Sequence, residues 1–128
     1  MDGQLLTAIG GGSDGRTKTK NKRRVARRRQ KEKDMIKHIV CFRLKDKAKA
    51  QEAKALLLSM RGKVPEAKEI EAGVDFLGSA RSYDVFLSVT VEDRAALDAY
   101  QKDPYHVGVV KKFMHAETES SVAVDFEM

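Results

Sequence analysis

A strictly alternating segment begins at Met35 and constrains the fold of this chain more than any other feature of its sequence. The residues that share one side of this segment are Ile36, His38, Val40, Phe42 and Leu44. Alternation with a period of two residues is typical of a β-strand. Because Ile39 and Cys41 add apolar groups to the opposite side, we expect a central strand of a sheet with both faces covered.

Two kinds of regular pattern follow this strand. Helical spacing of apolar residues extends over residues 46–61 and stops at Gly62, a typical residue after a helix C-terminus. A second helical region follows Asp93 and is interrupted at Asp103 and Pro104. Since Pro104 cannot continue a helix but suits the first position of another, we expect a new helix capped by Asp103. The further strands predicted from alternation are residues 67–77, 83–91 and 121–126.

The order of these elements repeats a strand–helix–strand unit. This order favours an α+β fold of the ferredoxin-like, split βαβ kind, βαββαβ, with a four-stranded antiparallel sheet and two helices on one face. The other sheet face would then carry too many Val, Ile and Phe side chains to be left in water. A second copy of the same sheet is the economical cover, so we expect a homodimer.

Basic residues are concentrated before the alternating segment. Residues 1–34 hold 11 of the 25 Lys and Arg residues but only 4 of the 19 Asp and Glu residues. We expect a flexible N-terminal extension and a separate domain over residues 35–128. Two interpretations of the extension stay open: a tag-like or upstream segment with no specific role, and an arm that neutralises nucleic-acid phosphates.

Several classes of protein are disfavoured by composition. A single cysteine, Cys41, excludes an internal disulfide and fits a reducing compartment. No apolar stretch approaches the roughly 20 residues of a membrane span, and no secretory signal is evident, so we expect a cytoplasmic protein without a membrane partner. The sequence has neither a glycine-rich nucleotide loop nor zinc-ligand spacing, so we expect no cofactor and no metal.

Two segments resemble the stress-responsive A/B barrel (Dabb) family. Residues 38–45, HIVCFRLK, resemble the family's first strand, and residues 100–106, YQKDPYH, resemble its Y-x-x-H-P-x-H motif. One departure is Asp103, which stands where the family usually has a His. The resemblance implies a dimeric α+β barrel with a small cavity, and a plant member that cyclises polyketides uses a Tyr and a His of this motif. These two positions correspond to Tyr100 and His106.

His106 and Tyr100 are therefore the candidate catalytic residues. His106 would lie near the N-terminal end of a helix, which disfavours imidazolium and suits a general base. Tyr100 could hydrogen-bond a carbonyl or enolate oxygen. The alternative also stays open, in which His106 donates to a backbone carbonyl and Tyr100 is a core aromatic residue.

Other residues are assigned from their positions in the pattern. His38, Val40 and Phe42 are expected to line the cavity. We expect His115 to be a surface residue and Cys41 to be a small buried residue.

Three functions remain compatible with this sequence. The first is a homodimer that binds a small hydrophobic or carbonyl-containing ligand in an internal cavity. The second is a cofactor-free cyclase-like or lyase-like enzyme that acts on a polyketide or another carbonyl compound. The third is nucleic-acid binding, which we expect only through residues 1–34 because the rest of the chain is close to neutral.

Overall fold

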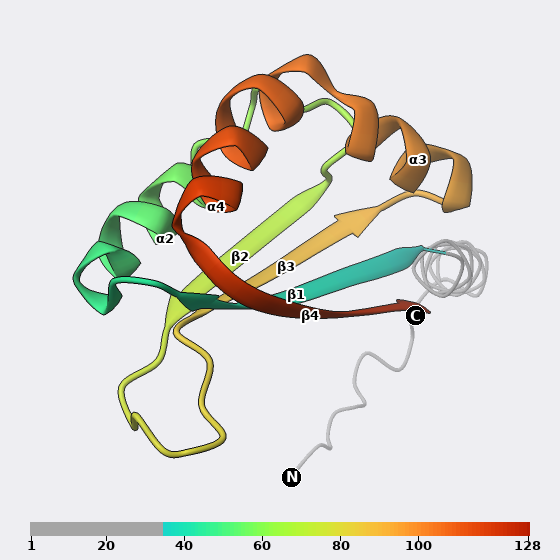
Figure 1. Cartoon of the computed structure of the whole chain (residues 1–128). Helices are drawn as coiled ribbons and strands as arrows, with labels where there is room; N and C mark the ends of the chain where they lie inside the picture. The colour runs from blue at the N-terminus through green and yellow to red at the C-terminus, as the bar shows by residue number, and fades with distance from the viewer. Residues whose placement is uncertain (1–34) are drawn as a thin grey trace, which may run out of the picture. The chain divides into compact units, whose positions relative to one another are not determined.

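A four-stranded antiparallel sheet forms the base of the fold, as predicted. The computed structural model describes residues 35–128, so the interpretations of residues 1–34 lie outside the described residues. The strands are β1 (Ile36–Leu44), β2 (Glu69–Val74), β3 (Val85–Val91) and β4 (Thr118–Glu127). Their order in the sheet is β2-β3-β1-β4 (Figure 1), which confirms that the first strand is central.

All of the described helical segments belong to two of the three connections between these strands, β1–β2 and β3–β4, and they cover one face of the sheet (Figure 1). They are the 3₁₀ turn η2 (Lys47–Lys49), the helix α2 (Ala50–Leu58), the helix α3 (Arg94–Lys102), the π-helix η3 (His106–Lys111) and the helix α4 (Lys112–Glu117). The predicted helix over residues 46–61 is therefore shorter than expected. Turns occupy its last residues, and Gly62 then adopts a positive φ of 77°.

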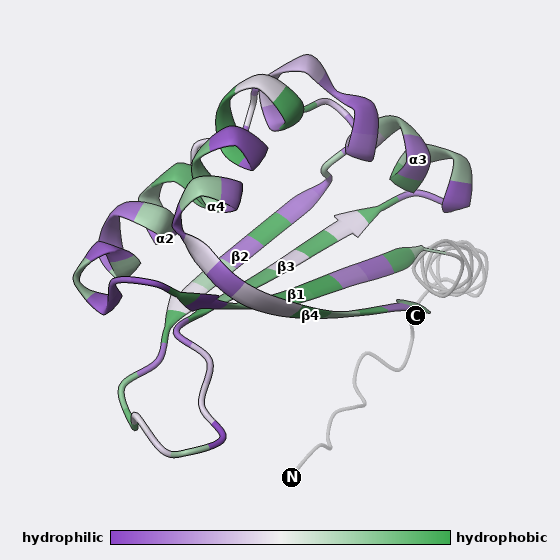
Figure 2. Cartoon of the chain, viewed as in Figure 1, coloured by the Kyte–Doolittle hydropathy of each residue, from purple (hydrophilic) through white to green (hydrophobic). Residues whose placement is uncertain are grey.

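The hydrophobic core lies between these helices and the sheet. Alternate residues of β3 point into it, and the hydropathy of β2 and β3 alternates along each strand in Figure 2. Leu57 of α2 and Val89 of β3 are completely buried there. The buried apolar residues of β1 and β3 are Ile36, Val40, Leu44, Val85, Leu87, Val89 and Val91.

The opposite face of the sheet has no helical cover among residues 35–128. The register pairs Ile39 with Val124 and Cys41 with Val122, so these apolar side chains share this uncovered face. Val124 is 60% exposed and Phe126 is 42% exposed. Cys41 is only partly buried because it lies here, so the prediction of a buried cysteine was wrong.

No helix within residues 35–128 is long and apolar enough to span a lipid bilayer.

Truncation of Leu57 tests the core directly. Leu57→Ala removes a fully buried side chain, so we expect the free energy of unfolding to fall by about 2–5 kcal/mol. Leu77→Ala is a matched control because Leu77 is 70% exposed, and its effect should stay within about 0.5 kcal/mol. Urea denaturation at one fixed protein concentration measures the free energy of unfolding of both variants. Equal effects of the two substitutions would contradict this description of the core.

Candidate functional site

The helix break at Asp103 and Pro104 positions the candidate site. Helix α3 ends at Lys102, and Asp103 has an extended backbone conformation. The Asp103 carboxylate then accepts hydrogen bonds from the backbone N–H groups of Tyr105 and His106, at 2.9 and 3.1 Å. Because Pro104 has no N–H to donate, it fits the first helical position after this cap. The chain thus resumes a helical path in a new direction, as the sequence predicts.

This change of direction brings His106 back onto Tyr100. The two rings are stacked, with centroids 4.3 Å apart and planes inclined by 25°. His106 Nδ1 also lies 3.0 Å from the backbone oxygen of Tyr100. A carbonyl oxygen only accepts hydrogen bonds, so Nδ1 carries the proton in the neutral ring. Nε2 then holds a lone pair and has no hydrogen-bond partner among residues 35–128.

The environment of His106 favours the neutral imidazole. Burial lowers the pKa of His106 below its usual value, and the charges of Lys111 and His38 lower it further. The hydrogen bond to Tyr100 and the charge of Asp103 oppose this shift but do not reverse it. We predicted a neutral ring from the helix N-terminus, whereas burial is the larger cause. His106 is therefore a neutral base near pH 7.

Tyr100 is a completely buried aromatic residue. Burial, reinforced by the charge of Asp103, raises the pKa of its phenol well above the usual range, so the hydroxyl keeps its proton. That hydroxyl donates to Met60 Sδ at 3.8 Å, which is a weak acceptor. A ligand oxygen that replaced the sulfur as acceptor would gain a stronger hydrogen bond.

His38 also packs against Tyr100. Its ring centroid is 5.8 Å from that of Tyr100, in an edge-to-face arrangement. The register of β1 and β4 places Asp125 opposite His38, and the Asp125 carboxylate is hydrogen-bonded to His38 Nδ1. A carboxylate in this position orients the imidazole ring.

These side chains surround a cavity of about 220 Å³ between the sheet and the helices, open to solvent. It is lined by each residue named from the sequence, namely His38, Val40, Phe42, Tyr100 and His106. His115 is exposed, as predicted, and also lines the cavity, so it lies at the rim. The lining residues that the sequence did not indicate are Leu57, Leu87, Gln101, Val110, Lys111, Met114, Thr118 and Ser121.

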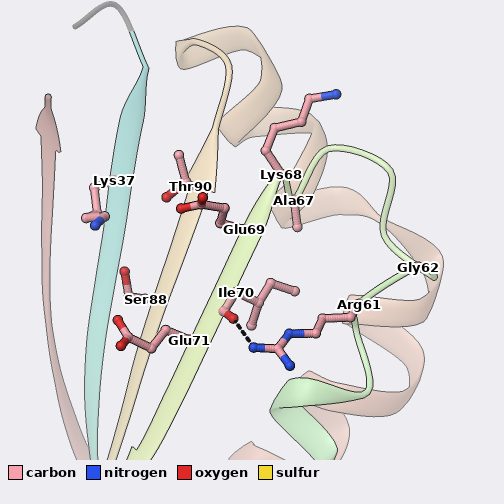
Figure 3. A pocket seen from close by; sticks show the side chains of 10 residues that line it. All are labelled: Lys37, Arg61, Gly62, Ala67, Lys68, Glu69, Ile70, Glu71, Ser88 and Thr90. Atoms are coloured by element: carbon pink, nitrogen blue, oxygen red, sulfur yellow. Dashed lines mark hydrogen bonds between the residues drawn. The ribbon is translucent and has the colours of Figure 1, made fainter. Parts of the chain in front are cut away.

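A larger and more open depression, of about 540 Å³, lies along strand β2 (Figure 3). Its charged lining residues are of both signs and include Lys37, Lys68, Glu69 and Glu71. Arg61 donates to the backbone oxygen of Ile70 at 2.7 Å (Figure 3) and is thus engaged with the protein itself. The buried polar side chains that line this depression, Ser88 and Thr90, are hydroxyls, and it contains no histidine, unlike the His106 cavity.

Among residues 35–128, no group of three or more His, Cys, Asp or Glu side chains is placed to hold a metal ion.

The fold and this cavity define a class of small α+β proteins with a ferredoxin-like protomer. Residues 36–128 match the model of the family described as "Stress responsive A/B Barrel Domain". The chain belongs to this family, which confirms the resemblance seen in its two sequence motifs. A comparison with curated proteins finds no match.

Solved structures share this fold. A dimeric protein of unknown function from Bacteroides fragilis has a TM-score of 0.66 and 24% identity, over 74% of this chain and 97% of its own. A dimeric ferredoxin-like protein of unknown function from Thermobifida fusca has a TM-score of 0.64 and 25% identity, over 73% and 91%. Hydroxynitrile lyase from Passiflora edulis has a TM-score of 0.63 and 20% identity, over 75% and 94%.

Titration of His106 tests the environment of the site. Because its pKa is lowered in the folded protein, the unfolded chain binds a proton at His106 first as the pH falls through about 6.5. The free energy of unfolding should therefore decrease on acidification, and His106→Asn should make this decrease shallower. NMR of the imidazole should give a midpoint below about 6.5. A midpoint above that value would contradict the buried, neutral ring.

Proposed function

We propose that this protein is a homodimer that binds a small carbonyl-containing molecule in the cavity beside His106. The convergence of His106, Tyr100 and His38 on one cavity carries this proposal. Such a combination of apolar walls and few convergent polar groups is typical of ligand sites. Its volume of about 220 Å³ lies below the roughly 300–1,000 Å³ of sites for drug-sized molecules, so the ligand is small.

The uncovered sheet face supports the homodimer. Its exposed side chains include Val122, Val124 and Phe126, and Ile39 pairs with Val124 on the same face. Contiguous exposed apolar surface of this kind marks an interface. The proteins from Bacteroides fragilis and Thermobifida fusca are described as dimeric and share this fold.

A second candidate function is cofactor-independent acid–base catalysis, cyclase-like or lyase-like. The neutral His106 ring favours it, because Nδ1–H is held by the Tyr100 carbonyl and Nε2 is left to accept a proton. In this reaction Nε2 takes a proton from the carbon next to a carbonyl, and the bonding electrons pass to the carbonyl oxygen as an enolate. Tyr100 O–H can stabilise that oxygen after exchanging its bond to Met60. The Passiflora edulis lyase has the same fold.

A charge on the uncovered face tests the dimer. Val124→Glu would bury a carboxylate in the interface, so we expect light scattering to show the mass of a monomer. Val109→Glu is the control, since Val109 is also exposed but belongs to the helical layer, and it should stay dimeric. A parent protein that is monomeric at micromolar concentration would contradict the proposed dimer.

Blocking the cavity tests ligand binding. Ser121 lies at the exposed rim and lines the cavity, so Ser121→Trp should fill the entrance without disturbing the core. We expect it to abolish the NMR shifts that 1,4-diacetylbenzene, a small ketone, induces in Val40 and Val110. Ser79→Trp, in an exposed turn, should leave them unchanged. Absence of these shifts in the parent protein would count against the cavity as a carbonyl site.

Proton exchange separates binding from catalysis. If His106 is a base, the protein should accelerate deuterium uptake into the methyl groups of the same ketone in D₂O. His106→Asn keeps a donor for the Tyr100 carbonyl but has no base, so the rate should fall by about 10²–10⁴-fold. Val107→Ala, at an exposed position outside the cavity, is the control. If the parent and His106→Asn gave equal rates of deuterium uptake, His106 would not act as a base, and the protein would be a binding protein only.

A further inference from the structure

The cavity is lined by cationic and hydrogen-bond-donating groups without an acidic side chain. Within residues 35–128 its lining contains Lys111 and the three histidines but neither Asp nor Glu. Lys111 lies in η3, and His115 and Thr118 follow it along and just after α4. Most of the cavity wall is apolar, so a charge brought inside would need a partner of opposite sign.

The π-helix η3 explains why Lys111 faces the cavity. Hydrogen bonds in a π-helix join residues five apart, so its turn is wider than that of an α-helix. Lys111, five residues after His106, therefore returns to the side on which His106 lies, and both residues line the cavity. Lys111 and His115 are four residues apart along the helical segments. Thr118 follows as the first residue of β4, and all three residues line the cavity.

Three carboxylates on the elements around the cavity have partners elsewhere. Asp103 accepts from the backbone N–H groups of Tyr105 and His106. Glu117 pairs with Lys49 at 3.3 Å, and Asp125 pairs with His38. Among residues 35–128, Lys111 forms no ion pair with a carboxylate, and its side chain bonds only the backbone oxygen of Gln101.

Lys111, His115 and Thr118 still have hydrogen-bonding groups that a ligand can use. Lys111 Nζ donates to the backbone oxygen of Gln101 at 3.2 Å, which uses one of its three N–H groups. His115 carries at least one ring N–H in either charge state. Thr118 Oγ1 is buried and has no hydrogen-bond partner among residues 35–128. Buried polar groups of this kind normally have a partner, and a ligand oxygen can serve as one.

We propose that the cavity selects carbonyl compounds that carry a carboxylate, with the carboxylate held by Lys111, His115 and Thr118 and the carbonyl beside His106. This inference rests on the proposed function and adds the charge of the ligand to it. The opening of the cavity to solvent at His115 lets an anion enter with its charged end at the rim. Specificity then comes from an ionic contact at one end and a neutral base at the other.

Two probes of nearly equal size separate charge from shape. In 4-acetylbenzoate a carboxylate replaces one acetyl group of 1,4-diacetylbenzene, and both molecules keep the acetyl carbonyl. We expect the full chain to bind 4-acetylbenzoate about tenfold more tightly in calorimetric or NMR titrations, the size of effect that one charge-assisted hydrogen bond gives. Added salt should weaken binding of the anion and leave binding of the diketone unchanged.

The matched variants are Lys111→Gln and Lys112→Gln. Both remove one positive charge, but Lys112 is exposed and does not line the cavity. Lys111→Gln should weaken binding of 4-acetylbenzoate about tenfold and leave that of 1,4-diacetylbenzene unchanged. Lys112→Gln should preserve the affinity for both probes, and Lys111→Arg should restore most of the preference for the anion.

The outcomes distinguish the two proposals. Equal affinity of the parent for both probes would overturn the carboxylate site while leaving the cavity as a ligand site. Equal losses of anion affinity in Lys111→Gln and Lys112→Gln would also overturn it, because the effect would then be one of net charge. Binding of neither probe at millimolar concentration would overturn the carbonyl site together with the inference that rests on it.

Discussion

The hydrogen bond between His106 Nδ1 and the backbone oxygen of Tyr100 is the contact on which the candidate site depends. It forms because Asp103 and Pro104 end one helix and begin another at an angle, which folds His106 back over α3. One contact thereby fixes the ring orientation, the tautomer and the free nitrogen. The cost of burying a charge then keeps the ring neutral, so the same local geometry determines both the position and the protonation state of the base.

The two faces of the sheet have separate roles because its strands are patterned differently. The buried apolar residues of β1 and β3 face the helices, and they form the core and the floor of the cavity. On β4 the pattern is reversed, so Val124 lies on the uncovered face while Asp125 lies beside His38. The edge strand thus contributes a carboxylate to the site and apolar surface to the proposed interface. Substitutions on the helix-facing side of β4 should therefore affect the site, and substitutions on its uncovered side should affect the proposed interface.

The fold was largely predictable, whereas only part of the site was. Alternation and helical spacing are local properties, so they predicted the central strand and the helix break at Pro104. Asp125 was missed because its contact with His38 depends on the register of two strands that are distant in sequence. Lys111 was missed because an α-helical turn would have directed it elsewhere, and no local pattern predicted the π-helix. Cys41 was misplaced because the alternation alone does not show which face remains uncovered.

The tautomer of His106 tests this account most directly. In ¹⁵N-resolved NMR spectra of the imidazole at neutral pH, we expect a protonated Nδ1 and an unprotonated Nε2, since the Tyr100 carbonyl can only accept a hydrogen bond. Neutral pH matters because burial holds the pKa of His106 below its usual value. A ring protonated at Nε2 alone, or an imidazolium at that pH, would contradict the account, because neither state leaves a free base facing the cavity.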